Sequence, residues 1–143
     1  AAWRRDLLAD QGYFPEHLLF GEDTVALAKM LQKGYYVAYV SDAQVYHSHS
    51  YSIIQDFKRY FDIGVLHETQ AGTLLQFGGP AGAGRKYVLS ELALMAKKRK
   101  YYLLPESFLR NICKFFAYKV GRRYKSLPVN WAAYLSMTPG WWS

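Results

Sequence analysis

The sequence predicts an α/β chain, with short strands plus helices, followed by a basic, aromatic and mostly helical C-terminal region. An acidic pair, Glu22-Asp23, opens a helical pattern that Gly34 closes, and two runs rich in Tyr and Val follow it directly. The charge then changes along the chain. Residues 1–80 hold six basic and nine acidic side chains, whereas residues 81–143 hold twelve basic and two acidic ones. Such a basic region is expected to meet an anionic partner.

Three helices are expected in the acidic part, over residues 4–10, 22–33 and from about residue 52 to residue 70. Pro15 disfavours helix in the residue before it, so a loop is expected around it. Helix 22–33 has acids in its first turn and lysines near its end, as the helix dipole favours. Apolar spacing in the third helix directs Phe57, Phe61, Val65 and Leu66 toward a core.

Two short strands are expected after the second helix, over residues 35–40 and 44–47. Both runs are rich in residues that favour strands, and Ser41-Asp42 supplies a turn between them.

The glycine-rich segment 76–85 is expected to be a hinge, so that the chain divides into residues 1–75, 76–85 and 86–143. A phosphate loop is the alternative, but the G-x-x-x-x-G-K-[ST] pattern is absent and no β-run precedes the segment. Helices are expected over residues 86–100 and 106–125, and an irregular aromatic tail over 131–143. One side of helix 106–125 would carry Phe108, Leu109, Ile112, Phe115, Phe116 and Val120.

The chain is 143 residues long, the size of one domain. Its single cysteine, Cys113, excludes an internal disulfide framework and is typical of a reducing compartment. The sequence shows no signal peptide and no run of about 18 uncharged apolar residues. It begins without Met, which suggests a piece of a longer protein.

The acidic pair Glu22-Asp23 has two interpretations. Acids in a first turn complement the helix dipole and cap free amides, which is a common structural role. Alternatively, a carboxylate fixed at a helix start takes a proton from an incoming nucleophile.

His47 and His49 stand two residues apart at the end of the second expected strand. At that spacing both imidazoles would point the same way and so allow a shared metal ion. A structural role is the alternative, because the spacing supplies only two ligands.

Four further residues are candidate substrate contacts: Arg4, Arg5, Arg59 and Tyr60. The first two arginines either bind an anion or form a solvated helix start. Lys58-Arg59-Tyr60-Phe61 either faces a substrate or forms a basic edge over a packed aromatic face.

The basic side chains of helix 106–125 fit an anionic membrane surface, a nucleic acid, or the ordinary polar face of a packed helix. The broad apolar side and the nearby tryptophans favour a lipid interface, and no nucleic-acid reader motif is present. The candidate membrane-surface residues are Arg110, Lys114, Lys119, Arg122 and Arg123.

Residues 1–70 hold an ordered set of motifs: A-W-R-R-D-L-L, G-Y-F-P-E-x-L-x-F-G-E-D-T, L-x-K-G-Y-x-V-A-Y-V, A-x-V-Y-H-S-H-S-Y-S and Q-D-F-K-R-Y-F-D-I-G. This set resembles the C-terminal half of family 2 inverting glycosyltransferases of GT-A fold, and in particular bacterial rhamnosyltransferases of O-antigen synthesis. The resemblance implies that residues 1–75 are the acceptor-side half of such a fold.

The resemblance also implies roles for single residues. Asp23 would be the base that deprotonates the acceptor hydroxyl, and Glu22 would support it. His47 would join a D-x-D motif around a divalent cation, Mg or Mn. His49 would either support His47 without touching the cation or replace it as a ligand. The mechanism would be a single displacement that inverts the anomeric carbon. No two aspartates of the chain stand in a D-x-D pattern, so the chain alone is not expected to transfer sugar.

The partners implied are a nucleotide-sugar donor, dTDP-rhamnose, and a cell-surface polysaccharide or polyprenyl-linked glycan as acceptor. The enzyme would be cytoplasmic and peripheral to the inner membrane of a bacterium, held there by its basic helices. The alternative is a non-catalytic module that binds anionic membranes through those helices. Nucleic acid is not expected as a partner.

Overall fold

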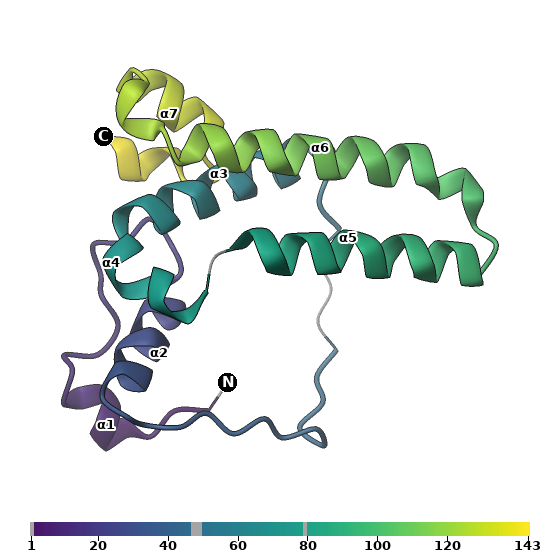
Figure 1. The fold of residues 1–143 in the computed structure, drawn as a ribbon. Coiled ribbons are helices and arrows are strands. Elements are labelled where there is room, and N and C mark those ends of the chain that lie inside the picture. Colours follow the sequence, from purple (N-terminus) through teal and green to yellow (C-terminus); the bar gives the residue numbers. More distant parts are fainter. Residues whose placement is uncertain (1, 47–49, 79) are drawn as a thin grey trace.

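The computed structural model describes residues 2–46, 50–78 and 80–143, and it contains helices but no β-strand within those ranges (Figure 1). The α-helices are α1 (Arg5–Ala9), α2 (Glu22–Gln32), α3 (Ile53–Thr69), α4 (Ala71–Leu74), α5 (Pro80–Lys97), α6 (Leu104–Gly121) and α7 (Val129–Leu135). Four short 3₁₀ turns join or end them: η1 (Leu75–Phe77), η2 (Tyr101–Leu103), η3 (Tyr124–Ser126) and η4 (Pro139–Trp142).

The prediction of an α/β fold with strands over 35–40 and 44–47 is therefore wrong. Residues 35–46 form an irregular, exposed connection between α2 and α3 (Figure 1). Their backbone hydrogen bonds are local ones, from Ala43 N to Val40 O and from Gln44 N to Asp42 O. Strand propensity reflects how well a side chain fits a half-buried pleated surface, and a strand needs a paired neighbour. Tyr36 is 98% exposed, so it lies on no half-buried surface, and none of the described residues supplies a paired strand.

Helix α3 is the centre of the fold, and α6 packs along it. The two helices run in the same direction: Asp56 lies beside Arg110, and Glu68 lies beside Arg122. Ser52 begins α3 with a capping box, in which its hydroxyl accepts from the Gln55 amide while the Gln55 side chain accepts from the Ser52 amide. The core cluster consists of Leu19, Phe61, Val65, Ala117 and Ala132.

Two glycines allow α3 and α6 to approach closely. A Cβ atom on Gly64 would lie 2.4 Å from the Tyr118 carbonyl oxygen, and one on Gly121 would lie 2.0 Å from the Phe61 carbonyl oxygen. Atoms at those distances overlap, so the crossing requires glycine on both helices.

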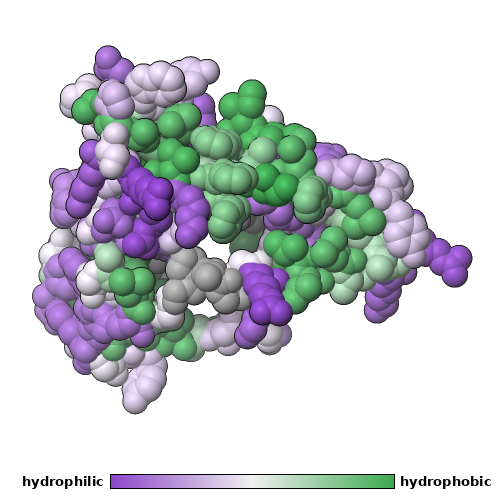
Figure 2. All heavy atoms as spheres, turned by 45° about the horizontal axis from the view of Figure 1, so that its top comes forward, coloured by the Kyte–Doolittle hydropathy of each residue, from purple (hydrophilic) through white to green (hydrophobic). Residues whose placement is uncertain are grey.

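The close crossing determines which face of α6 is buried. The helix buries its small residues Ser107, Ala117 and Gly121 against the rest of the molecule. The apolar side predicted for helix 106–125 is turned outward, except Val120, which is partly buried. Those exposed side chains are Phe108, Leu109, Ile112, Phe115 and Phe116, called here the α6 outer face. In Figure 2 hydrophobic residues gather on the side of the molecule that carries α5 and α6.

The C-terminal tail is ordered, which corrects the prediction of an irregular segment. It forms α7 and η4. The Trp142 ring packs on the rings of Phe61 and Tyr124, whose centroids lie 6.1 and 5.7 Å from its own. A tryptophan that fills a core gap can fix a short segment that helix propensity alone would not.

The glycine-rich segment 76–85 also differs from a plain loop, since α5 begins within it at Pro80. The three-part division of the chain stays a prediction.

Asp62 of α3 is a buried carboxylate that ties the tail to the core. Its Oδ2 accepts from the Met137 amide at 2.9 Å, whereas its Oδ1 is buried and accepts no hydrogen bond among the described residues. Burial raises the pKa of Asp62, although hydrogen bonds from Met137 and Ser136 oppose this effect. A raised folded-state pKa means that the folded protein holds the proton more tightly than the unfolded chain.

We expect Asp62→Asn to remove this pH dependence. The wild type should lose stability relative to the variant as the pH rises from the ordinary Asp pKa through the raised one, because ionised Asp62 is then buried. Urea unfolding of both proteins between acid and neutral pH measures the difference. The matched control is Asp10→Asn, which removes an exposed carboxylate. A stability difference that stays constant across this range would contradict the assignment.

Candidate functional site

The start of α2 rests on the C-terminal half of α3, and it is here that the predicted catalytic carboxylates lie. Gly21 precedes the helix with φ +76°, a left-handed conformation that favours glycine. A Cβ atom at Gly21 would lie 2.6 Å from Leu66 Cδ2. The glycine therefore allows the helix start to lie directly against Leu66.

Asp23 is exposed in the first turn of α2. Its Oδ1 accepts from the Thr24 amide at 2.7 Å and lies 3.3 Å from the Thr24 hydroxyl. Its Oδ2 accepts no hydrogen bond among the described residues. Glu22 is also exposed. The helix N-terminus carries partial positive charge, which the two acidic side chains complement. One oxygen of Asp23 is thus fixed by its neighbour while the other is open to an incoming group.

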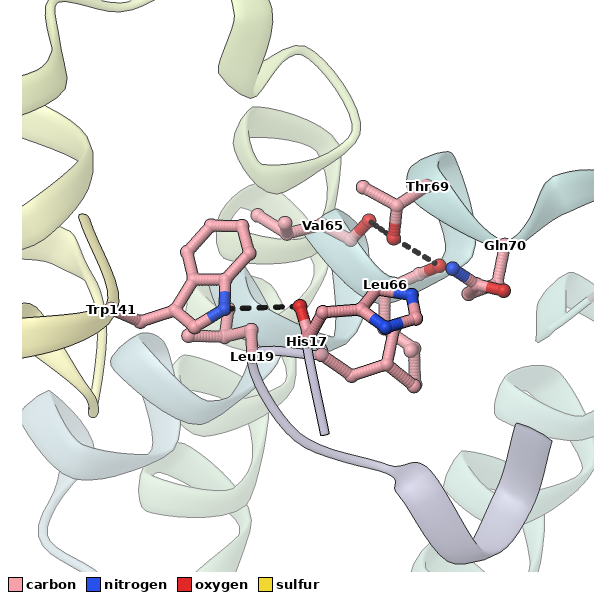
Figure 3. A pocket seen from close by; sticks show the side chains of 8 residues that line it. His17, Leu19, Val65, Leu66, Thr69, Gln70 and Trp141 are labelled. Carbon is pink, nitrogen blue, oxygen red and sulfur yellow. Dashed lines mark hydrogen bonds between the residues drawn. The ribbon is translucent and has the colours of Figure 1, made fainter. Parts of the chain in front are cut away.

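A small hollow lies beside this helix start (Figure 3). The loop before α2 contributes His17 and Leu19, α3 contributes Leu66 and Thr69, and the tail contributes Trp141. The Trp141 indole N–H donates to the His17 carbonyl oxygen at 3.4 Å, which closes one side. Three segments far apart in the sequence therefore form one wall.

The volume of this hollow is about 140 Å³. Pockets for complete ligands are usually about 300–1,000 Å³, so this one holds waters or part of a ligand. Most of its lining is apolar, with the His17 imidazole, the Thr69 hydroxyl and the Gln70 amide as polar groups. Asp23 is not one of its lining residues.

The two predicted histidines, His47 and His49, lie outside the described residues. Among the residues that are described, no three His, Cys, Asp or Glu side chains are grouped so as to hold a metal ion. The metal role of His47 and the supporting role of His49 stay predictions.

Arg4 and Arg5 lie at the start of α1 and do not line the small hollow. The Arg4 guanidinium pairs with the Asp6 carboxylate, and this hydrogen-bonded contact raises the pKa of Arg4 and lowers the pKa of Asp6. Both side chains of the pair are exposed. Arg5 is exposed and has no ion pair among the described residues.

Arg59 and Tyr60 are neighbours on α3 but face different surroundings. The Arg59 guanidinium lies over the Tyr51 ring, 5.6 Å from its centroid. Tyr60 faces α6, where the Lys114 ammonium lies 5.3 Å from its ring centroid. Burial raises the pKa of the Tyr60 phenol, so it is protonated at neutral pH. The four residues predicted to contact substrate are therefore spread over separate surfaces.

The five predicted membrane-surface residues divide into two groups. Arg110 is engaged in the core structure: its guanidinium donates to Asp56 Oδ2 at 2.8 Å and to the Tyr51 carbonyl at 3.0 Å. It also pairs with Glu106, and these carboxylates raise the pKa of Arg110. The other four, Lys114, Lys119, Arg122 and Arg123, line one groove.

This groove lies between α3, α5 and α6 and has a volume of about 830 Å³, within the range of ligand pockets. It is called here the α5–α6 groove. Its lining includes five basic side chains and one acidic one, Glu68, together with several aromatic rings. Sequence patterns did not indicate it, because it depends on how α5 lies against α6. The roles of His17 and Trp141 in the small hollow were missed for the same reason.

The comparisons with known proteins identify homologues. The chain is 39% identical over all 143 residues to the O-antigen chain rhamnosyltransferase WbaN of Salmonella anatum and, to the same extent, to the O-antigen chain rhamnosyltransferase RfbN of Salmonella typhimurium. This chain is homologous to O-antigen chain rhamnosyltransferases.

The homology covers the whole chain but only part of those relatives. The chain spans about half their length, 45% of each. No family model matches the sequence, and no solved structure is similar to it. The resemblance to rhamnosyltransferases is thus supported, whereas the GT-A fold is not shown for this chain. Among the described residues, no helix has both the length and the apolar character needed to cross a bilayer.

Proposed function

We propose that this chain works within a glycosyltransferase that adds rhamnose to an O-antigen chain or a related cell-surface polysaccharide. The observation that carries the proposal is the 39% identity over an alignment that covers all 143 residues of the chain. The open carboxylate at the start of α2 agrees with it, because sugar transfer to a hydroxyl requires a base.

In the proposed reaction Asp23 is the base and Glu22 supports it. The acceptor hydroxyl gives its proton to the open Oδ2 of Asp23, and its oxygen forms a bond to the anomeric carbon of the donor sugar. The bond from that carbon to the phosphate breaks at the same time, and the nucleoside diphosphate leaves with the electron pair. The configuration at the anomeric carbon is inverted.

The remaining partners are part of the same proposal. The donor is dTDP-rhamnose, and the acceptor is a glycan linked to a polyprenyl carrier at the inner membrane of a bacterium. A divalent cation, Mg or Mn, would neutralise the leaving diphosphate, with His47 as one ligand. Its other ligands would come from outside the described residues of this chain.

A chimera tests the proposal. The aligned segment of the Salmonella typhimurium relative is replaced by this chain, and the chimera is expressed in a strain that lacks the relative. We expect O-antigen to be restored, as judged by lipopolysaccharide gels. The unchanged relative is the positive control, and immunoblotting verifies that the chimera accumulates. A chimera that accumulates but restores no O-antigen would count against the proposal.

A second function, binding to anionic membranes, is favoured by the α6 outer face. Phe108 is 69% exposed and Phe116 is 60% exposed, beside the basic residues of the same helix. An amphipathic helix with aromatic and cationic residues is typical of proteins that lie on a bilayer surface. This function is compatible with sugar transfer to a lipid-linked acceptor.

We expect the 143-residue chain to sediment with vesicles that contain phosphatidylglycerol, and less with phosphatidylcholine alone. Burying one phenylalanine contributes about 1.5–3 kcal/mol, so Phe108→Ser should lower the affinity by about tenfold or more. Phe77→Ser, an exposed phenylalanine in η1, is the matched control. Equal loss in both variants, or binding that does not depend on acidic lipid, would argue against the α6 outer face as the contact.

A further inference from the structure

A polar contact joins α5 and α6 at one end of the α5–α6 groove. Glu91 of α5 accepts from the Ser107 hydroxyl and from the Asn111 amide, both at 2.9 Å. Beyond this contact, toward the N-terminus of α5, the lining residues Gly84, Arg85 and Val88 face α6 across the groove. The two helices run antiparallel there (Figure 1), so Arg85 lies opposite the C-terminal half of α6.

The two ends of the groove differ in chemistry. Toward the C-terminus of α6 the lining is cationic, with Lys119, Arg122 and Arg123 on that helix and Arg85 on α5. Toward the polar contact it is mainly aromatic and aliphatic, with Tyr60, Ile63, Tyr87, Val88 and Phe115. The lysine at this end, Lys114, pairs with Asp56 at 3.7 Å. From Asn111 to Arg122 the lining extends about 16 Å along the helix. A ligand that fits both ends has an anionic head and an apolar body.

Most of the positive charge at the cationic end is not neutralised. Arg122 pairs with Glu68 at 3.0 Å, and Lys119 lies over the Phe115 ring at 5.6 Å. Arg85 and Arg123 form no ion pair within the described parts of the chain. A guanidinium group binds carboxylate and phosphate alike through paired hydrogen bonds. A phosphate or diphosphate has more oxygens and more charge than a carboxylate, so it is the head that can engage two unpaired arginines at once.

The position of Phe115 indicates which kind of apolar body the ligand has. It lines the groove and also belongs to the α6 outer face, so the groove is continuous with the exposed apolar surface. A nucleotide has a compact polar body and needs no such exit, whereas a lipid chain does. We propose that the α5–α6 groove binds an amphiphile with a phosphate or diphosphate head, with the head beside Arg85 and Arg123 and the chain along Tyr87 and Phe115.

The proposal concerns binding alone and does not require Asp23 to act as a base. Isothermal titration of the 143-residue chain with farnesyl diphosphate, without donor sugar, tests it separately from sugar transfer. We expect farnesyl diphosphate to bind more tightly than inorganic diphosphate, UDP or farnesol, because each of these lacks one half of the ligand. Its affinity should fall as salt is added. Equal binding of inorganic diphosphate or UDP, or displacement by random-sequence RNA, would overturn the assignment.

Two variants locate the site. Reversing the charge at both Arg85 and Arg123 with glutamate should lower the affinity for farnesyl diphosphate by about 25-fold or more. Tyr87→Ser should lower it while leaving the weak binding of inorganic diphosphate unchanged. The matched control reverses Lys97 and Lys98, which lie at the other end of α5 and do not line the groove. A loss in the control as large as in the arginine variant would refute the location, and circular dichroism verifies that each variant folds.

Discussion

Replacing Asp23 with asparagine in the full-length enzyme is expected to abolish most sugar transfer without disturbing the fold. A positioned general base contributes about 10²–10⁴-fold to a rate, and asparagine cannot accept the proton. The side chain is exposed, and its hydrogen-bonded oxygen is retained in the amide, so Thr24 keeps its partner. Initial rates of rhamnose incorporation, measured beside a thermal melt, separate the two effects.

Two controls interpret this experiment. Glu22→Gln alters the adjacent carboxylate and should reduce the rate less, since it is proposed only to support the base. Asp10→Asn removes another exposed carboxylate, after α1, and should leave the rate unchanged. Turnover near that of the wild type in the Asp23 variant would exclude this residue as the base.

Gly121→Ala should destabilise the fold strongly, because it adds a methyl group inside the crossing of α3 and α6. The new methyl group would lie 2.0 Å from the Phe61 carbonyl oxygen, on a backbone that cannot rotate away. The two helices would have to separate, and Phe61 and Ala117 at their interface are fully buried. Inserting extra volume into a packed core costs about 1–3 kcal/mol, and a backbone contact belongs at the upper end of that range.

Chemical unfolding measures this cost, and Gly72→Ala is its matched control. Gly72 lies in α4 with no atom close to the position of a Cβ, so alanine there should be neutral or slightly stabilising. If Gly121→Ala unfolded at the same denaturant concentration as Gly72→Ala, the close crossing of α3 and α6 would be wrong.

The helices were predictable from local signals in the sequence. The acidic first turn and the glycine after it place α2 within a residue of its observed bounds, Glu22–Gln32. The helix expected from about residue 52 matches α3, which Ser52 caps, and Phe61, Val65 and Leu66 are buried as the spacing indicated. These features act within one helix, which is why the sequence alone reveals them.

What the sequence did not reveal depends on contacts between distant segments. Residues 35–46 have the composition of strands, but no neighbour among the described residues pairs with them. Helix α6 has a strong apolar side, yet two glycines and Ala117 determine which side packs on α3. Hydrophobic spacing predicts a buried face, and it does not detect an interface built from small residues.

The same distinction applies to the candidate sites. Asp23 was predicted as a candidate because a helix start places a carboxylate at a known position. The α5–α6 groove combines Arg85 with residues more than twenty positions later, so only the packing of the helices brings them together. Four of its basic residues were nevertheless recognised as a group from the charge of helix 106–125.

The most direct test of the proposed function is the transfer of labelled rhamnose from dTDP-rhamnose to a lipid-linked acceptor by the purified chimera that carries this chain. We predict transfer that the Asp23→Asn chimera lacks. A folded chimera that transfers no rhamnose, while the unchanged Salmonella typhimurium relative does so under the same conditions, would contradict the assignment of this chain to rhamnosyl transfer.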